Sequence, residues 1–264
     1  MGCDIHMYVE KRQADGTWTV VAGRNPRIDD YRKYAESARK RGDEEYALSM
    51  VAQADAIESG TGREFSHDEP EMYMEYDAPE VYKDWVWDGR NYDLFAILAN
   101  VRNGHGFAGI ETGMGFKPIA MPRELPPDVS AYVKGRSDSW DCDGHSHSYH
   151  ALTDLLAYDW HQITFRYGVV SEAEYLTFKE KGSPESWCGD VSGYSVRNIS
   201  LSQMDDLLAG ELRREPDVTY YTRVKWMLAY KNAVGSFYSD AIPKLQALAG
   251  DDPTSVRIVF WFDN

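Results

Sequence analysis

The sequence predicts an α+β fold with a mainly antiparallel central sheet, flanking helices and a helical-hairpin insertion. Residues 3–10 alternate between apolar and polar side chains, as a half-exposed strand does. Residues 27–59 are rich in Ala, Glu, Arg and Lys, which is typical of helices. Residues 255–263 are apolar on both faces, which predicts an interior strand. We expect 1–264 to form a single α+β domain, with 27–59 as an αα-hairpin insertion within it.

The composition indicates a protein of the cytoplasm with a substantial core. Hydrophobic residues make up 43% of the 264 residues. No apolar run reaches the roughly 18 residues that a membrane span needs. The N-terminus lacks the basic and apolar regions of a secretory signal. The three cysteines contain no CxxC pair, which fits a reducing compartment.

The net charge of −15 argues against general nucleic-acid binding, because proteins that bind the phosphate backbone usually present a basic face. Two alternatives stay open. One is a local basic pocket within the acidic protein. The other is an acidic surface that imitates DNA and blocks a host protein.

The first strand presents two candidate metal ligands. Asp4 and His6 are two residues apart, so they lie on the same face of the strand. Asp15-Gly16 then predicts a hairpin turn into residues 18–22. The alternative is that Asp4 and His6 are the polar face of a half-exposed strand.

The helical segments are predicted from apolar spacing and from capping residues. Helices are expected at about 30–41 and 43–58. A further helix is expected over 87–101, with Asp88 or Asn91 as its N-cap.

Two regions are expected to depart from simple helices. A helix over 230–248 should either be kinked at Pro243 or begin a new first turn there. Residues 64–84 are acidic and aromatic without a clear period, and predict a wrapping loop with a short strand.

Residues 102–116 contain five glycines and predict a loop whose backbone can approach a ligand closely. The polar groups that it could offer to a ligand are Asn103, His105 and Glu111. The phosphate-binding pattern GxxxxGK[ST] is absent from it, and its glycines do not follow a strand. A flexible connection is the alternative.

Residues 139–150 hold three histidines, two aspartates and a cysteine. The stretch has no helical or strand period, so we expect a loop. Imidazole, carboxylate and thiolate are ligands of first-row metals, which makes His145 and His147 candidate ligands. A solvated turn that happens to contain histidines is the alternative.

Two more strands are expected, at 163–170 and 218–228. We expect the final strand, 255–263, to pair with 218–228 and with the N-terminal strand.

Three blocks of the sequence resemble a family of hypothetical proteins from bacteriophages and bacteria. They are the opening Met-Gly-Cys-Asp-Ile-His, the block Arg-Asn-Tyr-Asp-Leu-Phe-Ala-Ile-Leu-Ala-Asn-Val-Arg-Asn-Gly, and the closing Val-Arg-Ile-Val-Phe-Trp-Phe-Asp-Asn. The likeness runs from end to end of the chain. It implies a protein of the bacterial cytoplasm, with or without phage infection, and supplies no catalytic residues.

A second resemblance concerns metal chemistry. Asp4-x-His6 and Gly144-His-Ser-His147 are similar to the first and last motifs of calcineurin-like metallophosphoesterases. In that family these motifs bind two metals that activate a hydroxide. The middle motifs do not match, because Asp88 and Asp93 have the wrong spacing and Asn103-Gly-His105 has the wrong order. The resemblance implies a divalent metal, Zn or Mn, as cofactor.

Two classes of function follow. The first is a metal-dependent hydrolase of a phosphoester or nucleotide, with His150 and Asn103 as catalytic residues. The second is a non-catalytic phage accessory protein that binds a small-molecule ligand or blocks a host protein. A structural metal held by the same residues is a third possibility. The expected metal ligands of the hydrolase are Asp4, His6, His105, His145 and His147.

Overall fold

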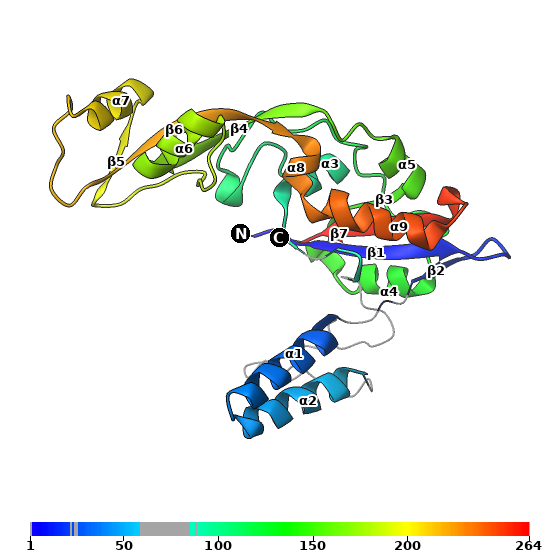
Figure 1. Cartoon of the computed structure of the whole chain (residues 1–264). Helices are drawn as coiled ribbons and strands as arrows, with labels where there is room; N and C mark the ends of the chain where they lie inside the picture. Colours follow the sequence, from blue (N-terminus) through cyan, green and yellow to red (C-terminus); the bar gives the residue numbers. More distant parts are fainter. Residues whose placement is uncertain (1, 22, 24–25, 59–84, 88, 264) are drawn as a thin grey trace.

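The computed structural model describes residues 2–21, 23, 26–58, 85–87 and 89–263. Within them the chain forms helices and two mostly antiparallel sheets, so the predicted α+β class is confirmed. The predicted single central sheet is replaced by two sheets, one of four strands and one of three. Figure 1 shows the four-stranded sheet beneath α5 and α9, and the three-stranded sheet at the opposite end of the molecule. No described helix is long and apolar enough to cross a membrane.

The four-stranded sheet has the order β2-β1-β7-β3. Its strands are β1 (Ile5–Arg12), β2 (Trp18–Val20), β3 (His145–Ala151) and β7 (Val256–Phe262). The expected pairing of the N-terminal and C-terminal strands is confirmed, with Ile5 opposite Phe262 in antiparallel register. Every residue of β7 is buried, as its two apolar faces predict.

The two faces of this sheet pack against different helices. The large core lies under α3 (Tyr92–Ala99), α5 (Leu152–Ala157) and α9 (Ile242–Ala249). On the other face, α4 (Ala131–Asp138) covers a small cluster that includes Tyr8, Val133 and Trp261. Figure 1 shows α4 on the side of the sheet opposite to α9. The side chains of β1 and β7 therefore enter one cluster or the other by strict alternation.

The three-stranded sheet has the order β4-β6-β5, with β4 (Ile163–Ser171), β5 (Val196–Ile199) and β6 (Thr219–Ala229). The prediction that 218–228 pairs with the final strand is wrong, because β6 pairs with β4 and β5 instead. Both edges of β7 are already bonded to β1 and β3, so no edge is left for β6. Two helices, α6 (Glu172–Lys181) and α7 (Leu201–Ala209), pack on this sheet.

The predicted loop over 139–150 is wrong in its second half. A 3₁₀ turn, η4 (Asp141–Asp143), is followed by β3. The register of β3 against β7 shifts between His145 and Ser148, and Ser146 has a φ of 53°. This β-bulge interrupts the alternation of the strand, which explains why no strand period is visible in the sequence.

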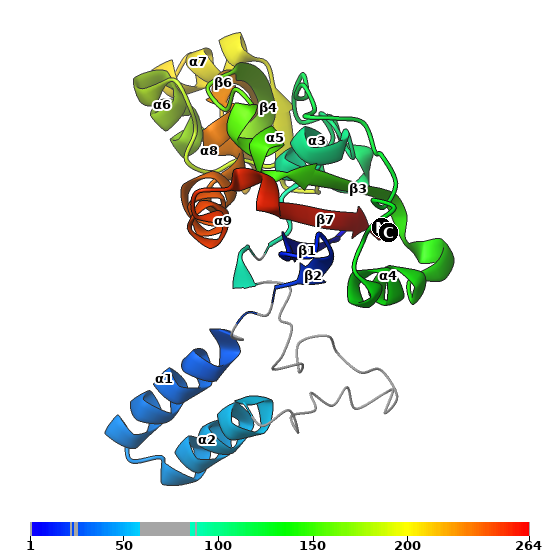
Figure 2. The same ribbon diagram turned by 90° about the vertical axis from the view of Figure 1, so that its right-hand side faces the viewer.

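The predicted hairpin region contains two helices, α1 (Pro26–Lys40) and α2 (Glu44–Glu58). They pack on each other through small clusters around Ala38, Ala47 and Ala54. Figure 2 shows this pair set apart from both sheets. The loop predicted over 64–84 lies outside the described residues.

The remaining helices differ from expectation at their ends. Asn91 is the N-cap of α3, accepting bonds from two backbone N–H groups, while Asp88 lies outside the described residues. The helix predicted over 230–248 is divided at Gly235 into α8 (Tyr230–Val234), a π-helical turn η5 (Phe237–Ala241) and α9. Two short 3₁₀ turns, η3 (Phe107–Gly109) and η6 (Pro253–Ser255), complete the described elements.

Candidate functional sites

Two of the predicted metal ligands meet at one end of the four-stranded sheet. The rings of His6 and His147 stack on Trp261 with centroid distances of 5.7 and 5.8 Å. Trp261 belongs to β7, which lies between β1 and β3. Strands two positions apart are separated by roughly 10 Å, whereas zinc ligand nitrogens lie about 2 Å from the metal. The indole therefore separates His6 and His147 too widely for one shared ion.

Asp4 and His6 also contact charged side chains. The carboxylate of Asp4 accepts two bonds from the Arg90 guanidinium, at 2.7 and 2.5 Å. The Nε2 atom of His6 lies 3.1 Å from the Oδ2 atom of Asp263. His6 is buried, and its ring also packs 4.0 Å from that of Trp140. Both candidate ligands are thus engaged by neighbours that stabilise the end of the sheet.

The bulge in β3 sends His145 and His147 to different environments. His147 packs on Trp261, and burial lowers its pKa. His145 packs on Phe262, on the side of the large core, and its Nδ1 atom lies 3.0 Å from the Ser146 hydroxyl. Among the residues that the structure describes, the buried Nε2 atom of His145 has no hydrogen-bond partner. The Gly-His-Ser-His spacing therefore does not place both imidazoles on one face.

The glycine-rich loop is held by Asn103. Its amide nitrogen donates to the Phe116 carbonyl and its amide oxygen accepts from the Phe116 N–H, both at 2.7 Å. A side chain at Gly115 would come within 2.4 Å of the Asn103 oxygen, which explains one of the glycines. His105 is exposed, and its Nδ1 atom lies 2.8 Å from the Asn103 carbonyl. The two hydrogen bonds of Asn103 therefore fix the loop against residue 116.

His150 lies in the core. Its side chain is fully buried, and its Nε2 atom lies 2.8 Å from the Leu98 carbonyl oxygen. The Arg123 guanidinium donates to its Nδ1 atom at 2.8 Å. Burial lowers the pKa of His150 to about 4. A group with this pKa stays neutral near pH 7, which does not suit the predicted acid–base role.

Within the described part of the chain, no three His, Cys, Asp or Glu side chains are grouped so that they could hold a metal ion. The divalent metal site stays a prediction.

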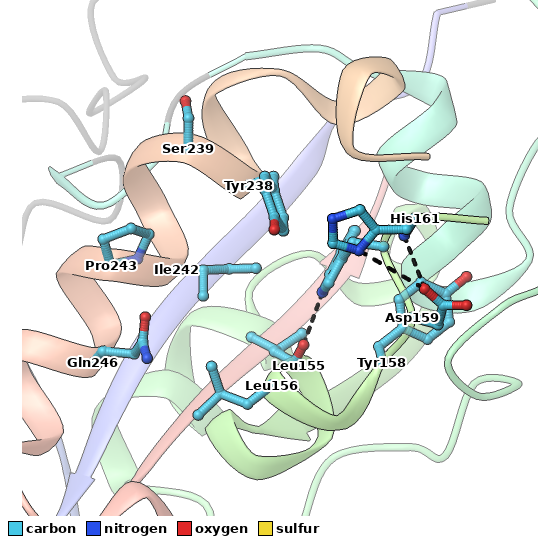
Figure 3. Close-up of a pocket in the computed structure, with 11 residues that line it drawn as sticks. Leu155, Leu156, Tyr158, Asp159, His161, Tyr238, Ser239, Ile242, Pro243 and Gln246 are labelled. Carbon is cyan, nitrogen blue, oxygen red and sulfur yellow. Dashed lines mark hydrogen bonds and ion pairs between the residues drawn. The ribbon is translucent and has the colours of Figure 1, made fainter. Parts of the chain in front are cut away.

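Sequence reasoning missed a cavity of about 480 Å³ between α5 and α9. Figure 3 shows Leu155 and Leu156 on one side and Ile242 on the other, with His161 and Asp159 at one end. Cavities of about 300–1,000 Å³ are typical of small-molecule sites.

The π-helical turn shapes one wall of this cavity. The Ile242 N–H donates to the Phe237 carbonyl, five residues earlier. Pro243 has no N–H, so it cannot donate to the Ser239 carbonyl as an α-helical residue would. The widened turn places Tyr238 and Ser239 on the cavity lining. Such π-helical turns occur frequently at functional sites.

Three aromatic rings line part of the cavity. Tyr158 and Trp160 lie edge to face at 4.9 Å and 75°, and the ring of Tyr238 lies 5.8 Å from Trp160 at 50°. The indole N–H of Trp160 donates to the Leu155 carbonyl, which fixes the ring. Burial raises the pKa of Tyr158, so its phenol is neutral at physiological pH.

The charged groups lie at the rim. Among the described residues that line the cavity, Asp159 is the one carboxylate, and none is Lys or Arg. The Asp159 carboxylate accepts a bond from the His161 N–H at 3.0 Å, and lies 3.9 Å from the Nδ1 atom of His161. The sequence drew attention to Pro243, which lies on one wall of the cavity. The opposite wall is formed by residues some eighty positions earlier, and no local pattern in the sequence links the two walls.

Comparisons with known proteins found no match to a family model, to a curated protein or to a solved structure.

Proposed function

We propose that the protein is a non-catalytic binding protein whose cavity between α5 and α9 takes a small organic cation. The observation that supports this most directly is the combination of three aromatic rings and one carboxylate around the same cavity. This is the small-ligand alternative among the functions that the sequence predicts. The hydrolase stays a prediction, and the neighbours that engage Asp4, His6 and His150 do not favour it.

The aromatic walls favour a cation over a neutral ligand. The face of Tyr or Trp attracts an ammonium group electrostatically, by about 0.5–2 kcal/mol depending on how far the pair is desolvated. Tyr158, Trp160 and Tyr238 offer rings at large mutual angles, so a rounded group can contact more than one of them. Quaternary ammonium groups have this rounded shape and carry no N–H for water to bind.

The charge distribution supports the same choice. Asp159 gives the rim a negative charge, and no Lys or Arg among the described lining residues offsets it. The net charge of −15 adds a long-range field that attracts cations. The apolar side chains of Leu156 and Ile242 would contact the hydrocarbon part of the ligand.

The test compares choline with 3,3-dimethylbutan-1-ol, its uncharged carbon isostere, by calorimetry on the full chain. We expect choline to bind at least about tenfold more tightly, since the pair differ mainly in charge. Equal affinity for the two compounds, or binding of neither, would contradict the proposal.

Variants locate the binding. Tyr238→Leu and Asp159→Asn should each weaken choline binding several-fold, whereas Tyr238→Phe keeps the ring and should bind nearly as wild type. Tyr194→Leu is the matched control, because Tyr194 is fully exposed and does not line the cavity. Choline binding that survives Tyr238→Leu unchanged would place the ligand elsewhere.

Metal content distinguishes the predicted hydrolase from the proposed binder. Stoichiometric zinc or manganese in the purified protein, lost in the double variant His145→Ala and His147→Ala, would favour the hydrolase. Choline binding that is unchanged in that double variant would support the binder.

A further inference from the structure

The three-stranded sheet is locally basic within an acidic protein. The chain contains 43 Asp and Glu residues, yet β4, β5 and β6 contain none of them. The same strands carry four basic residues, Arg166, Arg197, Arg223 and Lys225. The sheet therefore differs in charge from the chain as a whole.

The register of β4 and β6 places rings and cations in two adjacent rows. Phe165 pairs with Met227, Tyr167 pairs with Lys225, and Val169 pairs with Arg223. Residues paired across strands, and residues two apart along one strand, share a face of the sheet. Phe165 and Tyr167 therefore form a row along β4, and Lys225 and Arg223 form a parallel row along β6.

The contacts agree with this arrangement. The Lys225 ammonium lies 4.1 Å from the ring centroid of Phe165 and 5.5 Å from that of Tyr167. The Arg223 guanidinium donates to the Gly189 carbonyl at 3.1 Å. Among the described residues, neither Lys225 nor Arg223 is in an ion pair with a carboxylate, although Asp190 follows Gly189 in the chain.

This face is open to solvent at the end where the rings lie. Met227 is 66% exposed, Ile163 61% and Phe165 37%. The opposite face is buried, with Val224 and Trp226 packed in the cluster under α6 and α7. Among the described residues, the exposed rings and cations therefore lie on the face opposite that cluster, and the far end of this face, at Val169, is buried beside Cys188.

We propose that this face binds single-stranded nucleic acid. Unpaired bases would stack on Phe165 and Tyr167, while the phosphates would lie along Lys225 and Arg223. Aromatic platforms beside cations bind single strands with little sequence preference, because every base has a flat face. A duplex hides those faces, so it should bind less well. An acidic peptide could pair its carboxylates with Lys225 and Arg223, but it has no flat bases to stack on the two rings.

The test measures fluorescence anisotropy of a labelled oligothymidylate of about 15 nucleotides on the full chain. We expect binding at about 50 mM salt that weakens steeply towards 200 mM, since phosphate binding releases counterions. The double variant Lys225→Ala and Arg223→Ala should bind at least about tenfold more weakly. Its slope of log affinity against log salt should be smaller by about 1.4, or about 0.7 for each lost phosphate contact.

The control variant is Arg197→Ala, which removes the same charge from the same sheet. Arg197 pairs across the sheet with the buried Tyr220, so it belongs to the other face, and its guanidinium bonds Glu215. This variant should bind as wild type. Phe165→Leu should weaken binding of the single-stranded oligothymidylate, because it removes a ring on which a base would stack. It should leave the slope of log affinity against log salt unchanged, because it removes no charge.

Several outcomes would overturn the proposal. Equal binding of duplex and single strand would show that the rings take no part. Tighter binding of a polyglutamate peptide than of the oligothymidylate would show an acidic protein as the partner. Absence of oligothymidylate binding at about 50 mM salt would show that this face is not a nucleic-acid-binding site. Choline binding at the cavity between α5 and α9 is a separate measurement, so none of these results bears on it.

Discussion

At the scale of the residue, His150 was predicted to be catalytic, but it is a buried histidine whose hydrogen bonds stabilise the core. Both ring nitrogens lie within hydrogen-bond distance of fixed partners, the Leu98 carbonyl and the Arg123 guanidinium. Because a guanidinium donates only, Nδ1 accepts and Nε2 donates, which is the neutral imidazole. Protonation would remove the acceptor and place a charge beside Arg123.

The stability of the protein should therefore fall at acidic pH. The pKa of His150 is about 4 in the folded chain and 6.5 as the unperturbed value, so the unfolded chain takes up the proton first as the pH falls. Stability from this residue is fully present above pH 6.5 and is lost between about 6.5 and 4. The loss is about 3 kcal/mol in the free energy of unfolding.

Urea unfolding of wild type and of His150→Gln at several pH values checks this expectation. The variant should be less stable at neutral pH, and the difference between the two proteins should shrink as the pH falls towards 4. His161→Gln is the control, because His161 is exposed. A difference that is constant with pH would contradict the assignment.

At the scale of the element, the bulge in β3 decides what each neighbouring histidine contacts. One extra residue lies between the pairs His145–Phe262 and Ser148–Phe260. A shift of one residue exchanges the two faces of a strand. His145 thus packs on the side of the large core and His147 on Trp261, despite their spacing of two.

Ser146 has the left-handed conformation that the bulge requires. Ser146→Val should lower the free energy of unfolding by about 1–2 kcal/mol, because a β-branched side chain is strained at positive φ. Ser146→Gly should be close to neutral, since it relieves the strain but loses the hydroxyl contact with His145. Chemical unfolding of both variants tests the bulge; equal destabilisation by Val and Gly would contradict it.

At the scale of the whole molecule, burial is unevenly distributed. Strand β7 is buried over its whole length and is bonded on both edges. The helices α1 and α2 pack on each other through two small clusters, in which four of the seven buried residues are alanine. Small side chains bury little apolar area, so this pair should open at lower cost than the sheet.

Hydrogen exchange followed by mass spectrometry measures this difference. Peptides from β7 and β1 should exchange most slowly, and peptides from α1 and α2 much faster. The matched comparison is α3, a shorter helix whose residues from Leu94 to Ala99 are buried in the large core. Protection of α1 and α2 equal to that of α3 would show that the pair is stabilised by more than its own contacts.

The sequence by itself determined the features that depend on local patterns. The alternation in β1, the apolar faces of β7 and the cap at Asn91 each follow from neighbours along the chain, because side-chain period and capping act over a few residues. These patterns were enough for the α+β class and for the pairing of β1 with β7.

Only the tertiary structure decided the sites. The bulge at Ser146 separated the two histidines of the Gly-His-Ser-His motif, and Trp261 came between His6 and His147. The cavity joins Tyr158 to Tyr238, and the basic face joins Phe165 to Lys225. Local propensity does not encode such long-range contacts, which form when distant segments bury their apolar surfaces together.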